Sequence, residues 1–381
     1  MFSSQLTEDQ MVLQDMSRKF SANEIAPVAA KHDQDSSFPV DIVQSAIELG
    51  LMNLTLDPDY GGSGLSMLDA CIVVEELAAG CAGTTTSLIG NDLGLAPIAI
   101  AGTEVQKQQF IAPVIEQKGL ASFCLTEPSA GSDFAGVRSK LTKVEGGYRL
   151  NGAKQWITNS GYAKQFAVFA TLDVSLREKG MCCVIVDAKA DGVTLGKHED
   201  KLGQRASDTR GITFDDVFIS QANLVGAEGK GFEIAIATLD HVRPLTASIA
   251  VGLSRRAFEF ALEYAKERKQ FGQPLTEYQI IQATLADAAT NLEASRLLVW
   301  QAAAKADRGE RNVLASTMAK SFAADAAMQI ATDAVQIFGG YGYMKEYPVE
   351  KLMRDAKFSQ IHQGPNQVQR LNIARELLEA G

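Results

Sequence analysis

The apolar pattern of this chain changes twice along its 381 residues, from helical spacing to short β-type runs and back to helical spacing. Near the start, Thr7–Gln10 has the polar sequence of a helix cap, and apolar residues follow it at helical spacing. Further helices are predicted over Leu68–Leu77 and Glu104–Ile115. A chain with this order is expected to hold a β-domain between two helical domains. The expected domains are 1–120, 121–230 and 231–381.

Short β-type runs punctuated by glycine pairs mark the middle region. Hairpin-type turns are predicted at Gly146-Gly147, Asn151-Gly152 and Asp191-Gly192. The expected strands are Ser122–Thr126, Tyr148–Leu150, Gln165–Thr171, Cys182–Val186 and Gly211–Phe218. The long amphipathic stretches that follow are Leu253–Arg268, Gln279–Ala306 and Val313–Phe338.

Composition excludes several classes of function. A net charge of −10 argues against binding of nucleic acid, which selects basic surfaces. No apolar run reaches the roughly 20 residues of a membrane span, and the first residues lack the pattern of a secretory signal. The five cysteines show no metal-binding or paired spacing, so we expect no metal site and a reducing, cytoplasmic location.

Three longer motifs carry the functional information. They are Cys124–Gly136, Gln155–Asn159 and Gln336–Tyr343. The glycines of the third motif follow a helical stretch and no βαβ unit surrounds them, so a dinucleotide-binding fingerprint is excluded. In this order and at these separations, the three motifs resemble those of the acyl-CoA dehydrogenase family, and the resemblance extends over nearly the whole chain.

The resemblance implies an α+β fold that is mainly α, with an N-terminal helical domain, a β-barrel-like middle domain that contacts flavin and acyl-CoA, and a C-terminal four-helix domain. It also implies one FAD per subunit, an acyl-CoA substrate, a homotetramer and electron-transfer flavoprotein or a similar protein as electron acceptor. By position, residues that match family cofactor contacts are Leu125, Thr126, Ser132, Trp156, Thr158, Arg268, Gln270, Phe271, Gln336, Gly340 and Gln367. Of these, Gln336 and Gly340 are expected to reach the cofactor across a subunit interface. Residues expected to contact substrate are Ser132, Asp240, Arg243, His362 and Gly364.

Gln363 departs from the family pattern. Many members carry at this position the glutamate that removes the α-proton of the substrate, and a neutral amide has no comparable basicity. Other members place the base at the position of Val242, which is aliphatic here. Neighbouring positions differ too, since His362 replaces a common tyrosine and Pro365 a common threonine. The usual first step of the reaction therefore lacks its base.

Asp92 stands where the family often has a small residue, in a stretch that resembles the wall of the acyl pocket. Burial in an apolar pocket raises the pKa of a carboxylate and makes it a better base once ionised. A base deeper in the pocket could remove the γ-proton of an α,β-unsaturated thioester, which is acidified by vinylogy. The Asp92/Gln363 combination resembles the cyclic-diene-forming members, which convert cyclohex-1-ene-1-carboxyl-CoA to cyclohexa-1,5-diene-1-carboxyl-CoA by 1,4-elimination.

Other interpretations remain open from the sequence. Asp92 could instead cap a helix or face solvent. The protein could be a dehydrogenase of saturated acyl-CoA or cyclohexanecarboxyl-CoA with Asp92 or His362 as relocated base. It could run in reverse as an enoyl-CoA reductase, or bind flavin and acyl-CoA without catalysis. An engineered exchange at Gln363 would not explain His362, Pro365 and Asn366 beside it.

Overall fold

A computed structural model describes residues 5–379, and its first part is helical as expected. Thr7 and Gln10 form a reciprocal capping box at the start of the first helix. The predicted helix over Glu104–Ile115 is wrong in one respect, because it is broken at Ile111, just before Pro113, into two shorter helices. The helices are α1 (Glu8–Phe20), α2 (Ala26–Asp35), α3 (Val40–Glu48), α4 (Met67–Gly80), α5 (Ala82–Ala101), α6 (Glu104–Phe110) and α7 (Ala112–Glu116), with a π-helical turn at Ser21–Ile25 between α1 and α2.

The middle region forms an eight-stranded sheet with the strand order β6-β7-β3-β2-β4-β5-β8, and β1 pairs in parallel with β4. The strands are β1 (Leu120–Cys124), β2 (Lys140–Val144), β3 (Gly147–Thr158), β4 (Ala163–Thr171), β5 (Met181–Asp187), β6 (Val193–His198), β7 (Thr209–Ser220) and β8 (Leu224–Val225). All five expected strands are present, whereas β2, β6 and β8 were not predicted. β2 and β6 are largely exposed and alternate poorly, and β8 has only two residues.

One of the three predicted turns is wrong. Asn151-Gly152 lies inside β3, at a shift in the register with β7. Gly152 has φ +150°, and a Cβ there would lie 2.5 Å from Ser139 Oγ. Glycine at this position therefore permits a β-bulge in which the two backbones approach closely, and the chain does not reverse there.

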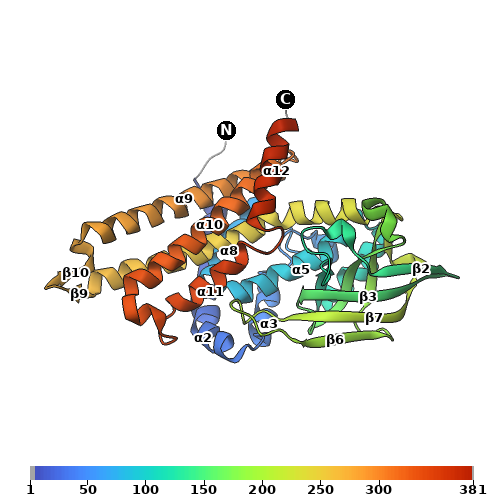
Figure 1. Cartoon of the computed structure of the whole chain (residues 1–381), viewed down its shortest axis with the longest axis horizontal. Helices are drawn as coiled ribbons and strands as arrows, with labels where there is room; N and C mark the ends of the chain where they lie inside the picture. Colours follow the sequence, from blue (N-terminus) through green and yellow to red (C-terminus); the bar gives the residue numbers. More distant parts are fainter. Residues whose placement is uncertain (1–4, 380–381) are drawn as a thin grey trace.

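The last part of the chain is again helical. The elements are α8 (Gly231–Glu267), the two-stranded hairpin β9 (Lys269–Gln270) and β10 (Gln273–Pro274), α9 (Gln279–Asp307), α10 (Val313–Phe338), α11 (Val349–Ser359) and α12 (Asn366–Glu379). Figure 1 shows α8 running from the sheet to the opposite end of the molecule, where the β9–β10 hairpin lies. At 37 residues, α8 is about 55 Å long.

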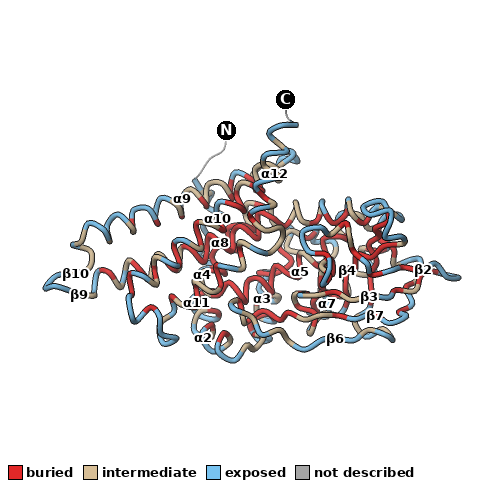
Figure 2. Tube along the Cα trace, viewed as in Figure 1, coloured by how far each residue is buried: buried red, intermediate tan, exposed pale blue. Residues whose placement is uncertain are grey.

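The main core lies where α4 and α5 pack against α8 and its neighbours α9 and α10, as the buried segments in Figure 2 show. Of the described helices, α8 alone is long and apolar enough to cross a membrane, but 72% of its most apolar window is buried inside the protein. This burial is what the central helix of a helical bundle requires. α5 also packs against β1, so it connects the helical core to the sheet.

Candidate active site

Asp92 lies inside α5, where its side chain neither caps a helix nor faces solvent. The residue is 2% exposed. Its Oδ1 accepts a long hydrogen bond of 3.5 Å from the backbone N–H of Thr55, and its Oδ2 has no partner among the described residues. Burial raises the pKa of Asp92 to about 7, although the backbone amides of residues 53–55 partly oppose this shift. A carboxylate with this pKa can both accept and release a proton near neutral pH.

A pocket of about 240 Å³ opens beside this carboxylate. Thr55 connects two sides of the pocket, because its hydroxyl lies 3.1 Å from His241 Nε2 on α8 while its backbone N–H faces Asp92. Burial lowers the pKa of His241. The lining residues are Thr55, Leu56, Asp57, Tyr60, Asp92, Ala96, Ala99, Ile100, Lys107 and His241.

Gln363 lies in the loop between α11 and α12 with φ +50°. The hydroxyl of Thr246 donates a 2.6 Å hydrogen bond to its Oε1, and the side-chain amide of Gln369 donates to its backbone carbonyl. Val242, the other position at which the family can hold a base, is fully buried one turn before Thr246. Neither position therefore offers a carboxylate.

His362 is a poor candidate for the base. Its ring stacks on Phe358 with centroids 4.1 Å apart, and its Nδ1 lies 2.9 Å from the Phe358 carbonyl, to which a protonated Nδ1 donates. Burial, together with the positive charge of Lys320, lowers the pKa of His362 to about 3. The imidazole is therefore neutral and weakly basic at pH 7. Lys320 also donates a 2.8 Å hydrogen bond to the carbonyl of Gly364, which fixes the loop that carries Gln363.

Asp240 and Arg243 form an ion pair of 2.5 Å on one side of α8, and Arg243 also donates to Ser316 on α10. Both belong to the run that holds His241 and Val242, so four functional candidates fall on a single turn of α8. In the described residues the Nε of Arg243 has no hydrogen-bond partner. This unsatisfied donor fits a site that receives an anionic or carbonyl group.

The residues expected at the flavin ring lie at the end of β3 and in the loop that follows β1. The backbone N–H of Gln155 donates to the carbonyl of Thr126, which joins the first two motifs. Leu125 is buried and Ser132 is exposed on the loop beyond them. A Cβ at Gly90 on α5 would lie 3.1 Å from Thr158, so the helix of Asp92 packs directly behind this strand.

Trp156 fits a stacked ring ligand. It is 60% exposed, and it has φ +58° within a stretch where the β3–β7 register shifts. An aromatic side chain held out of a sheet by a bulge offers its face to a partner. The Oδ1 of Asn159, close by, is buried without a hydrogen-bond partner among the described residues. These residues therefore suit the isoalloxazine of FAD.

The residues expected at the FAD phosphates and adenine lie at the far end of α8. The Arg268 guanidinium stands 5.3 Å from the ring centroid of Tyr341, next to Gly340, and Phe271 is 96% exposed. Arg268 and Gly340 were expected to reach the cofactor from opposite sides of a subunit interface. In this structure they are neighbours in one chain. The reason is that α8 and α10 end together, with Tyr264 stacked on Phe338 at 4.0 Å. The members are Arg268, Gln270 and Phe271 beside the hairpin and Gln336 and Gly340 after α10.

Distance separates this group from the flavin-ring group. Figure 1 shows the sheet that contains β3, with Trp156 and Thr158 among its last residues, on the opposite side of the molecule from the β9–β10 hairpin that follows Arg268. One chain therefore does not bring all the expected FAD contacts together. Gln367 is exposed in the first turn of α12, away from both groups in sequence.

Thr55 and His241 are functional candidates that the sequence did not identify. His241 stood inside the run from Leu239 to Pro244, and a histidine beside two expected substrate contacts was an available signal. Thr55 gave no signal, because only the fold brings its loop against α5 and α8.

Comparison with known proteins identifies the group to which this architecture belongs. Family models for the acyl-CoA dehydrogenase N-terminal, middle and C-terminal domains match residues 7–118, 122–217 and 229–378. Cyclohexane-1-carbonyl-CoA dehydrogenase of Geobacter metallireducens is 40% identical over 98% of this chain and 98% of that protein. Butyryl-CoA dehydrogenase of Megasphaera elsdenii is also 40% identical, with a TM-score of 0.96 over 99% of this chain and all of that one. A chain in a structure reported for the electron-transferring flavoprotein of Acidaminococcus fermentans matches equally well, with 40% identity and a TM-score of 0.96 over 99% of this chain and all of that one.

Proposed function

Since this chain belongs to the acyl-CoA dehydrogenase family and is an FAD-dependent oxidoreductase, we propose that its substrate is cyclohex-1-ene-1-carboxyl-CoA and its product the cyclohexa-1,5-diene thioester. In this proposal Asp92 is the base, and Gln363 occupies the usual position of the base without acting as one. The observation that carries the proposal is a buried carboxylate with one oxygen unpartnered among the described residues, beside a pocket whose lining does not include Gln363.

The position of Asp92 along the acyl pocket determines which proton it can take. Gln363 is bonded to Thr246, whereas Asp92 shares its pocket with His241, five residues or about 7.5 Å earlier on α8. A base displaced in this way reaches past the α-carbon. In the cyclohexene thioester the C3 proton lies γ to the carbonyl, and its loss leaves a dienolate delocalised onto the thioester oxygen.

Charge balance then requires a hydride to leave from C6, the saturated carbon β to the carbonyl on the other side of the ring. FAD, when bound, supplies the acceptor for this hydride. Asp92 takes the proton on a carboxylate oxygen, and Gln363, being neutral, leaves the α-carbon without a competing base. Its amide can instead stabilise a thioester substrate by hydrogen bonding.

Oxidation of a saturated ring is the second candidate, because the chain is as similar to cyclohexane-1-carbonyl-CoA dehydrogenase as it is to butyryl-CoA dehydrogenase. In that case Asp92 would have to take an α-proton. The low pKa of His362 makes it the weaker alternative base for such a step.

The cofactor would be held by Trp156 and Thr158 at the ring and by Arg268 and its neighbours at the phosphates. The separation of the two groups in one chain supports a homotetramer in which a second subunit supplies Arg268, Gln270, Phe271, Gln336 and Gly340. We further propose electron-transfer flavoprotein as acceptor, which the similarity to a chain of such a structure supports. Five buried free cysteines support a reducing, cytoplasmic location.

The test is bleaching of the oxidised flavin under anaerobic conditions. We expect cyclohex-1-ene-1-carboxyl-CoA to bleach the flavin, and butyryl-CoA and cyclohexanecarboxyl-CoA to leave it oxidised. Asp92→Asn should abolish the bleaching, because an amide cannot accept the proton. Bleaching by the saturated thioesters that survives in Asp92→Asn would refute the proposal and direct attention to His362.

A further inference from the structure

The pocket beside Asp92 extends from the buried carboxylate to the protein surface. Asp92, Ala96, Ala99 and Ile100 line it from one face of α5, and the helix rises by about 12 Å from Asp92 to Ile100. Asp92 is 2% exposed at one end and Ile100 is 43% exposed at the other. A volume of about 240 Å³ has room for several water molecules, each of which occupies roughly 30 Å³ in the liquid.

Titratable groups follow one another along this pocket. His241 shares Thr55 with Asp92, since its Nε2 lies 3.1 Å from the Thr55 hydroxyl and the Thr55 backbone N–H faces Asp92. At the open end, Lys107 is paired with Glu104 at 2.8 Å, and Tyr60 donates to the same Glu104. That bond raises the pKa of Tyr60 to about 12, so the phenol stays protonated. Asp57 is exposed at the same end and has a free route to solvent.

We infer that His241 receives the substrate proton from Asp92 through this pocket and releases it to solvent at the end formed by Asp57, Tyr60 and Lys107. The inference rests on the proposed function of Asp92. The C3–H bond of the substrate breaks, its electron pair remains in the dienolate, and the proton passes from the Asp92 carboxyl to the neutral imidazole. His241 is thus a positioning residue that restores Asp92, and Thr55 orients its ring.

A proton route of this kind is useful because Asp92 is only 2% exposed, whereas the residues at the open end of the pocket reach solvent. Burial lowers the pKa of His241, so the ring is neutral before it accepts the proton and gives it up readily afterwards. Among the described residues that line the pocket, the titratable groups are Asp57, Tyr60, Asp92, Lys107 and His241. Of these, His241 alone shares a hydrogen-bonding neighbour, Thr55, with Asp92.

The test follows solvent deuterium in recovered substrate. The FAD-loaded enzyme is incubated in D₂O with cyclohex-1-ene-1-carboxyl-CoA and no electron acceptor, and the deuterium at C3 is measured by mass spectrometry. Wild type should incorporate deuterium, because the proton on Asp92 exchanges before the reaction reverses. In His241→Ala the exchange rate, divided by that variant's own single-turnover bleaching rate, should be at least tenfold lower than in wild type, and added imidazole should restore this ratio.

His241→Gln is the second variant, since it keeps a hydrogen-bonding side chain toward Thr55 but cannot carry a proton. Slow exchange in this variant, with an unfolding temperature close to wild type, supports transfer through the ring. Wild-type exchange in either variant, or a defect that imidazole does not restore and that Gln repairs, overturns the inference. Normal bleaching in Asp92→Asn would instead overturn the proposed function, whatever His241 does.

Discussion

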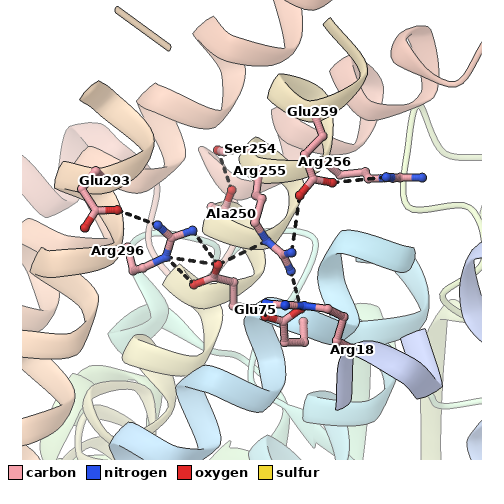
Figure 3. Close-up of polar contacts among 10 residues, drawn as sticks. Arg18, Glu75, Ala250, Ser254, Arg255, Arg256, Glu259, Glu293 and Arg296 are labelled. Atoms are coloured by element: carbon pink, nitrogen blue, oxygen red, sulfur yellow. Dashed lines mark hydrogen bonds and ion pairs between the residues drawn. The ribbon is translucent and has the colours of Figure 1, made fainter. Parts of the chain in front are cut away.

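Buried carboxylates at two places in this protein have opposite surroundings. Glu75 and Glu76 on α4 are 5% and 1% exposed, and Figure 3 shows arginines converging on Glu75 from neighbouring helices. Arg296 donates to Glu75 at 2.8 Å, and Arg18 and Arg255 donate to Glu76 at 2.8 and 2.6 Å. Asp92, on the next helix, is similarly buried, but within residues 5–379 it has no cationic partner and one of its oxygens accepts no hydrogen bond.

The presence or absence of a cationic partner distinguishes the structural ion cluster around Glu75 and Glu76 from the reactive carboxylate of Asp92. Burial lowers the pKa of Arg296, but the bond to Glu75 outweighs it, so the pKa lies above its ordinary value and the charges remain fixed. For Asp92, desolvation dominates and raises the pKa to about 7. A paired buried charge stabilises the association of α1, α4, α8 and α9, whereas an unpaired one retains the freedom to change its protonation state.

Removing the proton acceptor should produce the largest effect. We expect Asp92→Asn to slow flavin bleaching by the cyclohexene thioester by about 10³-fold, since a positioned base contributes 10²–10⁴-fold. Stopped-flow absorbance measures this rate. Asp59→Asn, which changes an exposed carboxylate outside the pocket, should stay within twofold of wild type. An Asp92→Asn enzyme as fast as that control would show that Asp92 is only a structural group.

Glu76→Gln tests the other half of the comparison. It should lower the free energy of unfolding by about 3 kcal/mol, because Arg255 would lose a buried anionic partner. Urea denaturation at fixed protein concentration measures this change. Glu293→Gln is the control, because Glu293 pairs with Arg296 at 2.6 Å but its side chain is 58% exposed, so the loss should stay below about 1 kcal/mol. Equal losses in the two variants would contradict the distinction.

The pH dependence of stability should distinguish Asp92 further. Its folded-state pKa of about 7 exceeds the ordinary 3.8, so its contribution to stability is complete below pH 3.8 and is lost as pH rises through 7. Between pH 5.5 and 8, substrate-free wild type should therefore lose about 2 kcal/mol more than Asp92→Asn. Parallel urea denaturation series measure this difference. Identical pH profiles would mean that Asp92 ionises normally in the folded protein.

The smallest effect concerns the neutral amide at the usual base position. Thr246→Val removes the hydroxyl that donates to Gln363 and should cost about 1 kcal/mol of unfolding free energy. Bleaching by the cyclohexene thioester should change less than threefold, because Gln363 takes no proton. Thr284→Val, which removes an exposed hydroxyl bonded within its own helix, is the stability control. A tenfold loss of rate in Thr246→Val alone would give Gln363 a larger role than we propose.

The order of helical, β and helical regions could be predicted because it depends on local periodicity, which the strands β4, β5 and β7 and the helices α9 and α10 retain clearly. The turn prediction at Asn151-Gly152 was wrong because the same dipeptide is compatible with a hairpin turn and with a β-bulge, and only the strand pairing selects between them. β2 and β6 were missed because their exposed faces leave little apolar alternation to detect.

Some features of the candidate site likewise follow from the sequence, and others depend on the tertiary structure. The sequence by itself determined that Gln363 and Val242 cannot act as bases and that Asp92 is an additional acid, because chemical identity needs no coordinates. Only the tertiary structure decided that Asp92 is buried without a counter-ion, that Thr55 and His241 share its pocket, and that Arg268 lies beside Tyr341. A pKa depends on desolvation and on neighbouring charges, and both arise from segments that meet only when α5, α8 and the loop at residues 53–55 pack together.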